Sequence, residues 1–539
     1  MVALLQINEI AKIAGIPNEY LEPCGKYKAK IDTSVFEYLK DVPDGKVVLV
    51  TAITPTKAGE GKTTTSIALL EGMGKINQKA ILSLREPSLG PVFGIKGGAT
   101  GGGLASLDPR EEINLHFTGD MHALTSSINL IAAIIDNHIF QGNELKIDPN
   151  QIVWKRAMDM NDRSLRNIII GRGERNGIER ENGFVITVAS ELMAILCLAN
   201  DAEDFKKRVQ QIIVAYNQSG DPIRVKDLKI SHAIMKLMKD ALKPNLVQTI
   251  ENNPVLVHGG PFANIAHGCN SLIAIKLARK LAPISITEAG FGSDLGAEKF
   301  FDIACRFGGI KPDGVVMVAT LRALKMHGGQ LLEKINEENV SALQKGVANL
   351  KVHMENIKKF GVPCLVAINH FASDHQSEIE ALENWCKENN YEVSFLDGYL
   401  KGGEGATDLA RKVVKMLDNE PSFYKPLYKL DLSIEEKIER ICKQIYRAGN
   451  VKFTNKAKEQ IARFKDLGYE HFPVCMAKTP LSLSDNPEII GAPEGFTMTI
   501  RELSLSAGAG FIVALTGEIL RMPGLPKMPS AVLMEDLPY

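Results

Sequence analysis

A short loop with two glycines, a lysine and a threonine carries the clearest chemical signal in the sequence. It reads ITPTKAGEGKTTT over residues 53–65, between the apolar run Val47–Val50 and a run of good helix formers. A strand, a glycine-bearing loop and a helix in this order place backbone N–H groups and the positive end of the helix around an anion. In such a loop Lys62 reaches the terminal phosphates and the Thr63 hydroxyl binds Mg²⁺. The pattern predicts a nucleoside triphosphate site.

This loop departs from the standard G-x-x-x-x-G-K-[ST] spacing at one position, because Thr56 stands where the first glycine is expected. The alternative is a surface turn that happens to read Gly-Lys-Thr, and the flanking strand and helix disfavour it. The residues expected to bind the nucleotide are Thr56, Lys57, Ala58, Gly59, Glu60, Gly61, Lys62 and Thr63.

The next predicted strand, Lys79–Leu84, ends in an arginine and a glutamate, Arg85 and Glu86. Ligands of open parallel sheets bind at the carboxyl ends of the strands, so Arg85 is expected beside the phosphate loop. A guanidinium in that place can hold a γ-phosphate or a second anion. The alternative is an arginine that only pairs with a neighbouring carboxylate.

Two stretches after this strand also carry polar or unusual residues. Residues 90–103 contain seven glycines in 14 positions, which favours close approach of the backbone to a ligand over a flexible linker. Farther on, Asp120 lies between His116 and His122, which are six residues apart and do not share a helix face. A metal site is the alternative there, but we expect Asp120 to be a catalytic or orienting carboxylate.

Short apolar strands alternate with helical patterns along most of the chain, which predicts an α/β fold with a mostly parallel sheet of the P-loop type. Glycine, acidic and aromatic residues follow several of these strands, at the edge where such a sheet holds its ligands. Phe371 and Tyr399 follow two neighbouring strands, and their rings either hold a flat heterocycle or pack in the core. The expected strands are 47–50, 79–84, 184–188, 255–257, 284–287, 315–318, 362–368 and 391–396.

The chain is expected to divide into three parts. A nucleotide-binding P-loop domain covers residues 1–350 and begins with a helical lead-in, a second α/β domain covers 351–450, and a smaller C-terminal domain covers 451–539. The basic cluster at 26–30 is expected to be a solvated surface.

Composition excludes several classes of function. The net charge of −1 with 24% charged residues argues against a general nucleic-acid or membrane-surface role. No uninterrupted apolar run approaches about 18 residues, so no membrane span is expected. The eight cysteines contain no C-x-x-C pair, which indicates reduced core thiols. With no secretory signal visible at the N-terminus, we expect a soluble cytoplasmic protein.

A series of motifs in a fixed order makes the sequence resemble the formate–tetrahydrofolate ligase family over nearly its whole length. They are TPTKAGEGKTTT (54–65), LREPSLGPVFGIKGG (84–98), INLHFTGDMHAL (113–124), VLVHGGPFANIAHGCNS (255–271), TEAGFGSDLGAEKF (287–300), VATLRALKMHGG (318–329), KGGEGA (401–406), SAGAGFIVALTG (506–517) and MPGLPK (522–527).

The resemblance implies ATP-dependent ligation of formate to tetrahydrofolate through a formyl phosphate intermediate. It also implies Mg²⁺, stimulation by a monovalent cation such as K⁺ or NH₄⁺, and a homotetramer. Position by position, it implies that Lys62 and Thr63 bind ATP, that Arg85 holds formyl phosphate with Glu86 beside it, and that Asp120 is an active-site carboxylate. Phe291 and Phe371 match aromatic residues of the folate site in that family.

Three features depart from the family's usual sequence. Tyr399 stands where the family usually has a tryptophan as the second plate around the pterin, Lys57 replaces a proline, and the tail after Lys527 differs. Two other functions remain as alternatives at this point. One is an acyl-phosphate-forming ligase of the same architecture with another acceptor, and the other is a P-loop nucleotide-switch protein.

Overall fold

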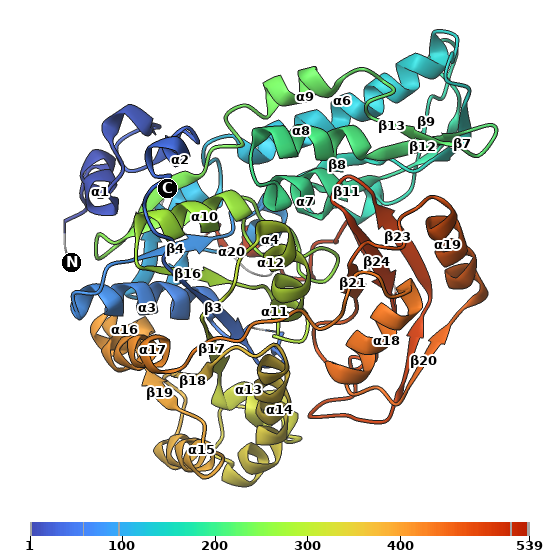
Figure 1. Ribbon diagram of the computed structural model, residues 1–539. Helices are drawn as coiled ribbons and strands as arrows, with labels where there is room; N and C mark the ends of the chain where they lie inside the picture. Colours follow the sequence, from blue (N-terminus) through green and yellow to red (C-terminus); the bar gives the residue numbers. More distant parts are fainter. Residues whose placement is uncertain (1–2, 58, 95–97, 518–519, 536–539) are drawn as a thin grey trace.

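The computed structural model describes residues 3–57, 59–94, 98–517 and 520–535. Its centre is one large, mostly parallel sheet flanked by helices, with smaller sheets beside it (Figure 1). The order of the main path is β1-β2-β14-β15-β4-β16-β3-β17-β18-β19, and all neighbours from β15 to β19 are parallel. The bounds are β1 Leu21–Pro23, β2 Ala29–Ile31, β14 Asn245–Thr249, β15 Pro254–Val257, β4 Ala80–Leu84, β16 Ile284–Glu288, β3 Lys46–Ala52, β17 Gly314–Ala319, β18 Cys364–Asn369 and β19 Val393–Leu396.

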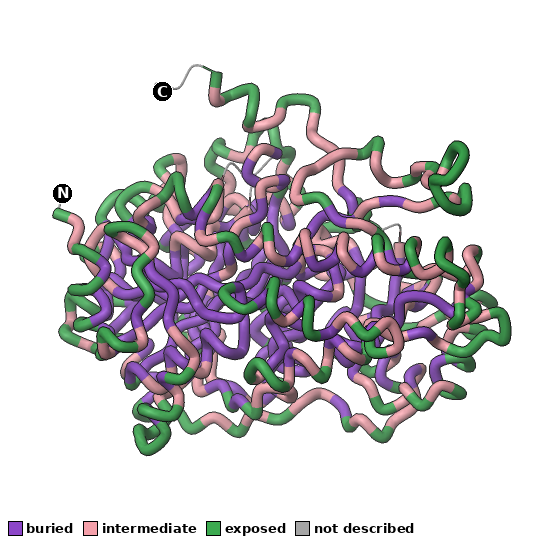
Figure 2. The backbone as a smooth tube through the Cα atoms, turned by 90° about the horizontal axis from the view of Figure 1, so that it is seen from above, coloured by how far each residue is buried: buried purple, intermediate pink, exposed green. Residues whose placement is uncertain are grey.

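The central strand β3 shows why the sheet is buried on both faces. Its side chains alternate between two cores: Val48 and Val50 pack with α3 and α17, whereas Val47 and Leu49 belong to the core that includes α14. Apolar residues on both faces are the pattern expected of a parallel strand covered by helices. Figure 2 shows this buried material running through the middle of the molecule. These helices are α3 Lys62–Lys75, α17 Thr407–Asn419 and α14 Val340–Lys359.

The first 45 residues form one edge of the sheet as well as the predicted lead-in helix. Helix α1, Ile7–Ala14, ends where Gly15 adopts a left-handed conformation. The two short strands after it, β1 and β2, pair with each other, and β2 continues the sheet against β14. The basic cluster at 26–30 is only partly the solvated surface that was expected: Lys26 is exposed, whereas Lys30 lies in β2 with only 3% of its surface exposed.

The segment after residue 350 extends the same sheet. Strand β18 pairs in parallel with β17, and β19 pairs with β18 at the far edge. The expected boundary at residue 350 falls inside α14. Where the chain divides into domains therefore stays a prediction. Helices of this half of the sheet are α13 Leu321–His327, α15 Gln376–Glu388 and α16 Gly398–Lys401.

The β5–β6 hairpin belongs to the large sheet, and residues 109–241 then leave it. The hairpin of β5 and β6 lies against β14, and the long helix α6 leads to several small sheets and helices (Figure 1). The expected parallel strand at 184–188 is different in the structure: β11 is short and pairs only with β8, outside the large sheet. Bounds are β5 Gly101–Gly102, β6 Ala105–Asp108, α6 Asp120–Phe140, β7 Ile147–Ile152, β8 Arg156–Met158, β9 Ile168–Ile170, β10 Arg180–Asn182, β11 Phe184–Ile186, α7 Glu191–Leu198, α8 Ala202–Gln211, β12 Ile213–Asn217, β13 Pro222–Arg224 and α9 Ser231–Leu237.

By length and composition alone, α6 is the one described helix able to cross a membrane, although we expected none. Its most apolar window is 33% buried in this structure. The core helix of a soluble protein passes the same test, so this observation is weak evidence of a span.

The remaining chain folds beside the large sheet, in the orange-to-red region of Figure 1. Two strongly amphipathic helices cover two small sheets there, and the first helix begins with a capping box formed by Ser433 and Glu436. All eight cysteines are free; six of them are buried, whereas Cys24 and Cys364 are half-buried. The bounds in this region are α18 Ile434–Gln444, β20 Asn450–Phe453, α19 Asn455–Asp466, β21 Val474–Ala477, β22 Thr497–Ile500, β23 Glu502–Ser506 and β24 Phe511–Leu515. Elsewhere in the molecule lie α10 Leu272–Leu281, which packs on β4 and β16, and the short helices α11 Gly296–Lys299, α12 Cys305–Gly308 and α20 Ser530–Leu533.

Candidate functional site

The phosphate loop joins the carboxyl end of β3 to the amino end of α3, as the sequence predicts. Gly59 and Gly61 have φ of +80° and +70°, so both lie in the left-handed region, and α3 begins directly at Lys62. Lys62 and Thr63 are half-buried in the first turn of this helix, where the helix dipole favours an anion. Lys57 is exposed, and Ala58 lies outside the described residues.

Glu60 braces the loop from inside. Its carboxylate accepts a hydrogen bond from the Thr56 backbone N–H at 2.6 Å and another from the Thr320 hydroxyl. Its carbonyl accepts from Nδ2 of Asn369 at 3.0 Å. Glu60 is only 1% exposed, so this carboxylate is a structural acceptor rather than a charge presented to a nucleotide. Thr56 stands at the position of the missing glycine, and its N–H donates to the Glu60 carboxylate of the same loop.

Glu288, at the end of β16, connects the phosphate loop to Arg85. One carboxylate oxygen accepts from the Thr63 hydroxyl at 3.0 Å, and the other lies 3.7 Å from an Arg85 guanidinium nitrogen. Arg85 packs closely over Gly290, where an added Cβ would lie 2.8 Å from its Nη1 atom. Arg85 thus has a carboxylate neighbour and also lies beside the loop that is expected to bind phosphate.

Asp120 and Glu86 form a buried acidic pair. Asp120 is the first residue of α6, and its two oxygens accept from Lys30 Nζ at 2.7 Å and from Asn245 Nδ2 at 2.9 Å. Burial and the neighbouring Asp120 carboxylate raise the pKa of Glu86 well above its usual range. The raised pKa of Glu86 favours its neutral form beside Asp120, and Lys30 lies against the Asp120 carboxylate.

The two histidines near Asp120 are not part of this pair. Both His116 and His122 are more exposed than Asp120, which is 1% exposed. In the part of the chain that the structure describes, no group of three or more His, Cys, Asp or Glu side chains could hold a metal.

The three expected folate-site aromatic residues lie in different surroundings. Phe291 follows β16 with φ of +57°, an uncommon conformation for a bulky residue, and is half-buried. The ring of Phe371 lies 3.7 Å from the guanidinium carbon of Arg322. Tyr399 is 54% exposed, and its ring lies against the glycines of the β5–β6 hairpin, Gly102 and Gly103.

Phe371 and Tyr399 follow strands that pair directly, so the expectation that they lie at adjacent strand ends is confirmed. Glycine allows the close approach on the hairpin side, because a Cβ on Gly103 would lie 2.1 Å from the Tyr399 carbonyl oxygen. Tyr399 is exposed and Phe371 is half-buried, so both are accessible to a ligand.

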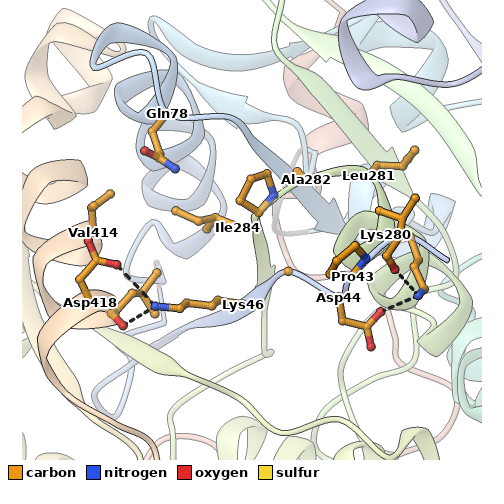
Figure 3. A pocket seen from close by; sticks show the side chains of 14 residues that line it. Pro43, Asp44, Lys46, Gln78, Lys280, Leu281, Ala282, Ile284, Val414 and Asp418 are labelled. Carbon is orange, nitrogen blue, oxygen red and sulfur yellow. Dashed lines mark hydrogen bonds and ion pairs between the residues drawn. The ribbon is translucent and has the colours of Figure 1, made fainter. Parts of the chain in front are cut away.

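A separate cavity of about 550 Å³ lies at the other end of the central strands, where β3 and β16 begin. Figure 3 shows that its charged side chains are already paired, Lys46 with Asp418 and Lys280 with Asp44. It offers no uncompensated charge for a phosphate, and it is far from the strand ends where open parallel sheets bind ligands.

The loop, the arginine and the acidic pair at one sheet edge agree with the motifs quoted for the resemblance. The model of the family described as formate–tetrahydrofolate ligase matches residues 1–536. The chain belongs to the formate–tetrahydrofolate ligase family. ATP, formate and tetrahydrofolate are the substrates of this ligase family, and the match over nearly the whole chain supports the same activity here.

Sequence reasoning missed several residues that complete the site of this family member. Glu288 stands at a predicted strand end and could have been chosen by the rule that selected Arg85. Lys30 and Asn245 could not, because their contact with Asp120 depends on how the sheet edge formed by β2 and β14 folds against α6.

Proposed function

We propose that this enzyme forms formyl phosphate from ATP and formate at the edge between the phosphate loop and Arg85, and then transfers the formyl group to tetrahydrofolate. The observation that carries the proposal is Glu288, whose carboxylate contacts both Thr63 and Arg85. Arg85 is thereby held beside the nucleotide loop, where a second anion must meet the γ-phosphate.

In the first step a formate oxygen attacks the γ-phosphorus while the bond to the ADP oxygen breaks. Formate is already an anion, so the obstacle is the meeting of two negative groups rather than deprotonation. Lys62 and Arg85 supply positive charge to this position. The Thr63 hydroxyl and the Glu288 carboxylate are oxygen donors of the kind Mg²⁺ prefers, and bound Mg²⁺ would neutralise phosphate charge.

In the second step the folate amine attacks the formyl carbon, phosphate leaves and the amine loses its proton. We propose that Asp120 orients the amine or accepts this proton, beside Glu86, whose pKa is raised by burial and by the Asp120 carboxylate. Lys30 and Asn245 hold both Asp120 oxygens, so they orient this carboxylate. Phe291, Phe371 and Tyr399 are proposed to bind the pterin through their ring faces.

The deciding experiment measures ADP release by the purified protein with MgATP and with formate, tetrahydrofolate, both or neither. Turnover that needs both, with formyl-folate formed in step with ADP, is the expected result. Formate-dependent turnover without a folate product would retain the first step and point to another acceptor. Turnover indifferent to formate would contradict the proposal.

The monovalent cation and the homotetramer remain proposals that the resemblance supports. K⁺ or NH₄⁺ is expected to raise the rate relative to an equal concentration of a large organic cation, measured in the same assay. Sedimentation velocity is expected to give a particle of four chains. A cytoplasmic location likewise stays a prediction.

A further inference from the structure

Thr54, the first residue of the phosphate loop after β3 and Ile53, is held by side chains from two helices behind the loop. Its N–H donates to Nε2 of His353 at 2.9 Å and to Oδ1 of Asn349 at 3.3 Å. Its carbonyl oxygen lies 2.9 Å from Nε2 of His327. Thr54 is fully buried, so these contacts satisfy its backbone groups in place of water.

The backbone partners determine which nitrogen of each imidazole carries the proton. A backbone N–H can only donate, so Nε2 of His353 is an acceptor and its Nδ1–H donates to the Ser293 hydroxyl at 2.7 Å. The N–H of Gly491 donates to Nδ1 of His327 at 3.1 Å, so Nε2–H of His327 donates to Thr54. Burial lowers the pKa of both rings, that of His353 to about 4, so both are neutral.

The same side chains hold Gly491, which belongs to the loop between β21 and β22. Asn349 Nδ2 donates to the Gly491 carbonyl at 2.7 Å and to the Thr54 hydroxyl at 3.1 Å. His327 binds the Gly491 N–H with one ring nitrogen and the Thr54 carbonyl with the other. Two side chains, one from the end of α13 and one from α14, therefore bridge the phosphate loop and the C-terminal part of the chain.

We propose that His327 and Asn349 are positioning residues that couple the C-terminal loop around Gly491 to the phosphate loop. The coupling rests on the proposed nucleotide site. A phosphate loop works only when its N–H groups are fixed in place, so loosening Thr54 weakens the binding of phosphates. Because coupling is reciprocal, a nucleotide bound to the loop also steadies Gly491.

Asn356 provides a matched control on the same helix. Like Asn349 it is a buried asparagine of α14 that donates to a carbonyl of the C-terminal part, in its case that of Ile445 at 2.9 Å. It lies seven residues farther along the helix. The Asn349 amide also donates to the Thr54 hydroxyl of the phosphate loop, whereas the Asn356 amide donates to the Ile445 carbonyl. Asn349→Ala and Asn356→Ala therefore remove similar groups, and the phosphate-loop contact is specific to Asn349.

The test uses the full chain and two measurements, MgATP affinity by calorimetry and hydrogen exchange of a peptide covering residues 486–495. We expect Asn349→Ala, which removes both side-chain contacts to Thr54 and the one to Gly491, to weaken MgATP binding by about tenfold. Asn356→Ala should keep the affinity of the unchanged chain. MgATP should slow exchange of the peptide in the unchanged chain and in Asn356→Ala, and not in Asn349→Ala.

Asn349→Asp and His327→Gln keep the size of the side chain and are measured in parallel in case the alanine variant does not fold. Equal affinity and equal protection in all folded variants would overturn the coupling while leaving the proposed function intact. Failure of the unchanged chain to bind MgATP would overturn both.

Discussion

Glu288 is a single side chain that holds two parts of the site in register, because its two oxygens contact Thr63 and Arg85 separately. A carboxylate in that place also lowers the net positive charge that meets the phosphates. The site therefore relies on Lys62, Arg85 and a divalent cation together. Loss of one positive side chain should mainly slow the step in which the second anion meets the phosphates.

At the scale of one residue, Arg85→Ala is expected to lower formate-dependent ADP release by about 10²- to 10³-fold, by analogy with the loss of one transition-state donor. Nucleotide binding should change little, because the phosphate loop and its Glu60 brace do not depend on Arg85. Steady-state rates and calorimetric MgATP affinity check this. An equal loss of turnover and affinity would mean that Arg85 only supports the fold, and Arg85→Lys should retain part of the rate if charge is what matters.

Tyr399→Ala is expected to raise the KM for tetrahydrofolate by about fivefold and to leave that for ATP nearly unchanged, since a stacked ring contributes on the order of 1 kcal/mol. Tyr399→Trp, which restores the family's usual residue, should lower the KM for tetrahydrofolate. Tyr38→Ala is a suitable control, because Tyr38 is 57% exposed and Tyr399 is 54% exposed. An unchanged KM for tetrahydrofolate in Tyr399→Ala would remove Tyr399 from the folate site.

At the scale of elements, the phosphate loop depends on Gly61 for two reasons. Its φ is +70°, and an added Cβ would lie 2.4 Å from Nδ2 of Asn369, which holds the Glu60 carbonyl. Gly61→Ala is therefore expected to displace Asn369 and weaken MgATP binding at least tenfold, beyond a cost of about 1 kcal/mol for the left-handed backbone.

Gly468→Ala separates these two effects. Gly468 has φ of +81°, and a Cβ there would meet nothing within 4 Å. It should lose a similar amount of stability in urea unfolding and keep full MgATP affinity. If both variants bind MgATP as well as the unchanged chain does, the contact between Gly61 and Asn369 has no role in the site.

The elements that the sequence predicts best are those with continuous apolar runs. Strands β3, β4, β15, β16, β17, β18 and β19 all lie on predicted runs, because a parallel strand buried on both faces needs apolar residues throughout. The run at 184–188 looks the same in sequence, yet β11 pairs only with β8. A run of apolar residues shows that a strand is buried and does not show which strand is its neighbour.

At the scale of the molecule, the same limit explains the single sheet. The alternation of strands and helices is identical whether β18 and β19 start a new sheet or continue an old one, so the sequence alone could not show that both strands extend the large sheet. Contacts between residues far apart in the sequence cannot be predicted for the same reason. Arg85 could be found from its strand end, whereas the contacts of Lys30 with Asp120 and of His327 with Gly491 depend on the packing of the whole chain.

Buried neutral histidines should also give the whole molecule a defined sensitivity to acid. Burial lowers the pKa of His258 to about 4, as it does for His353. Above about pH 6.5 these rings are neutral in both the folded and the unfolded chain, so their titration does not change the free energy of unfolding. Between about pH 6.5 and 4 only the unfolded chain takes up the protons, and each ring lowers the free energy of unfolding by about 1.4 kcal/mol per pH unit as the pH falls.

Urea unfolding of the unchanged chain and of His258→Gln, each at several pH values from 7 to 4.5, measures this contribution. The difference in slope is the informative quantity, because acids with a raised pKa, such as Glu86, act in the opposite direction in both chains. The variant should have the shallower loss of stability, by about 1.4 kcal/mol per pH unit in the acid range. Parallel slopes would mean that His258 takes up a proton in the folded chain, which its contacts with Ser271 and the Ala241 carbonyl would have to accommodate.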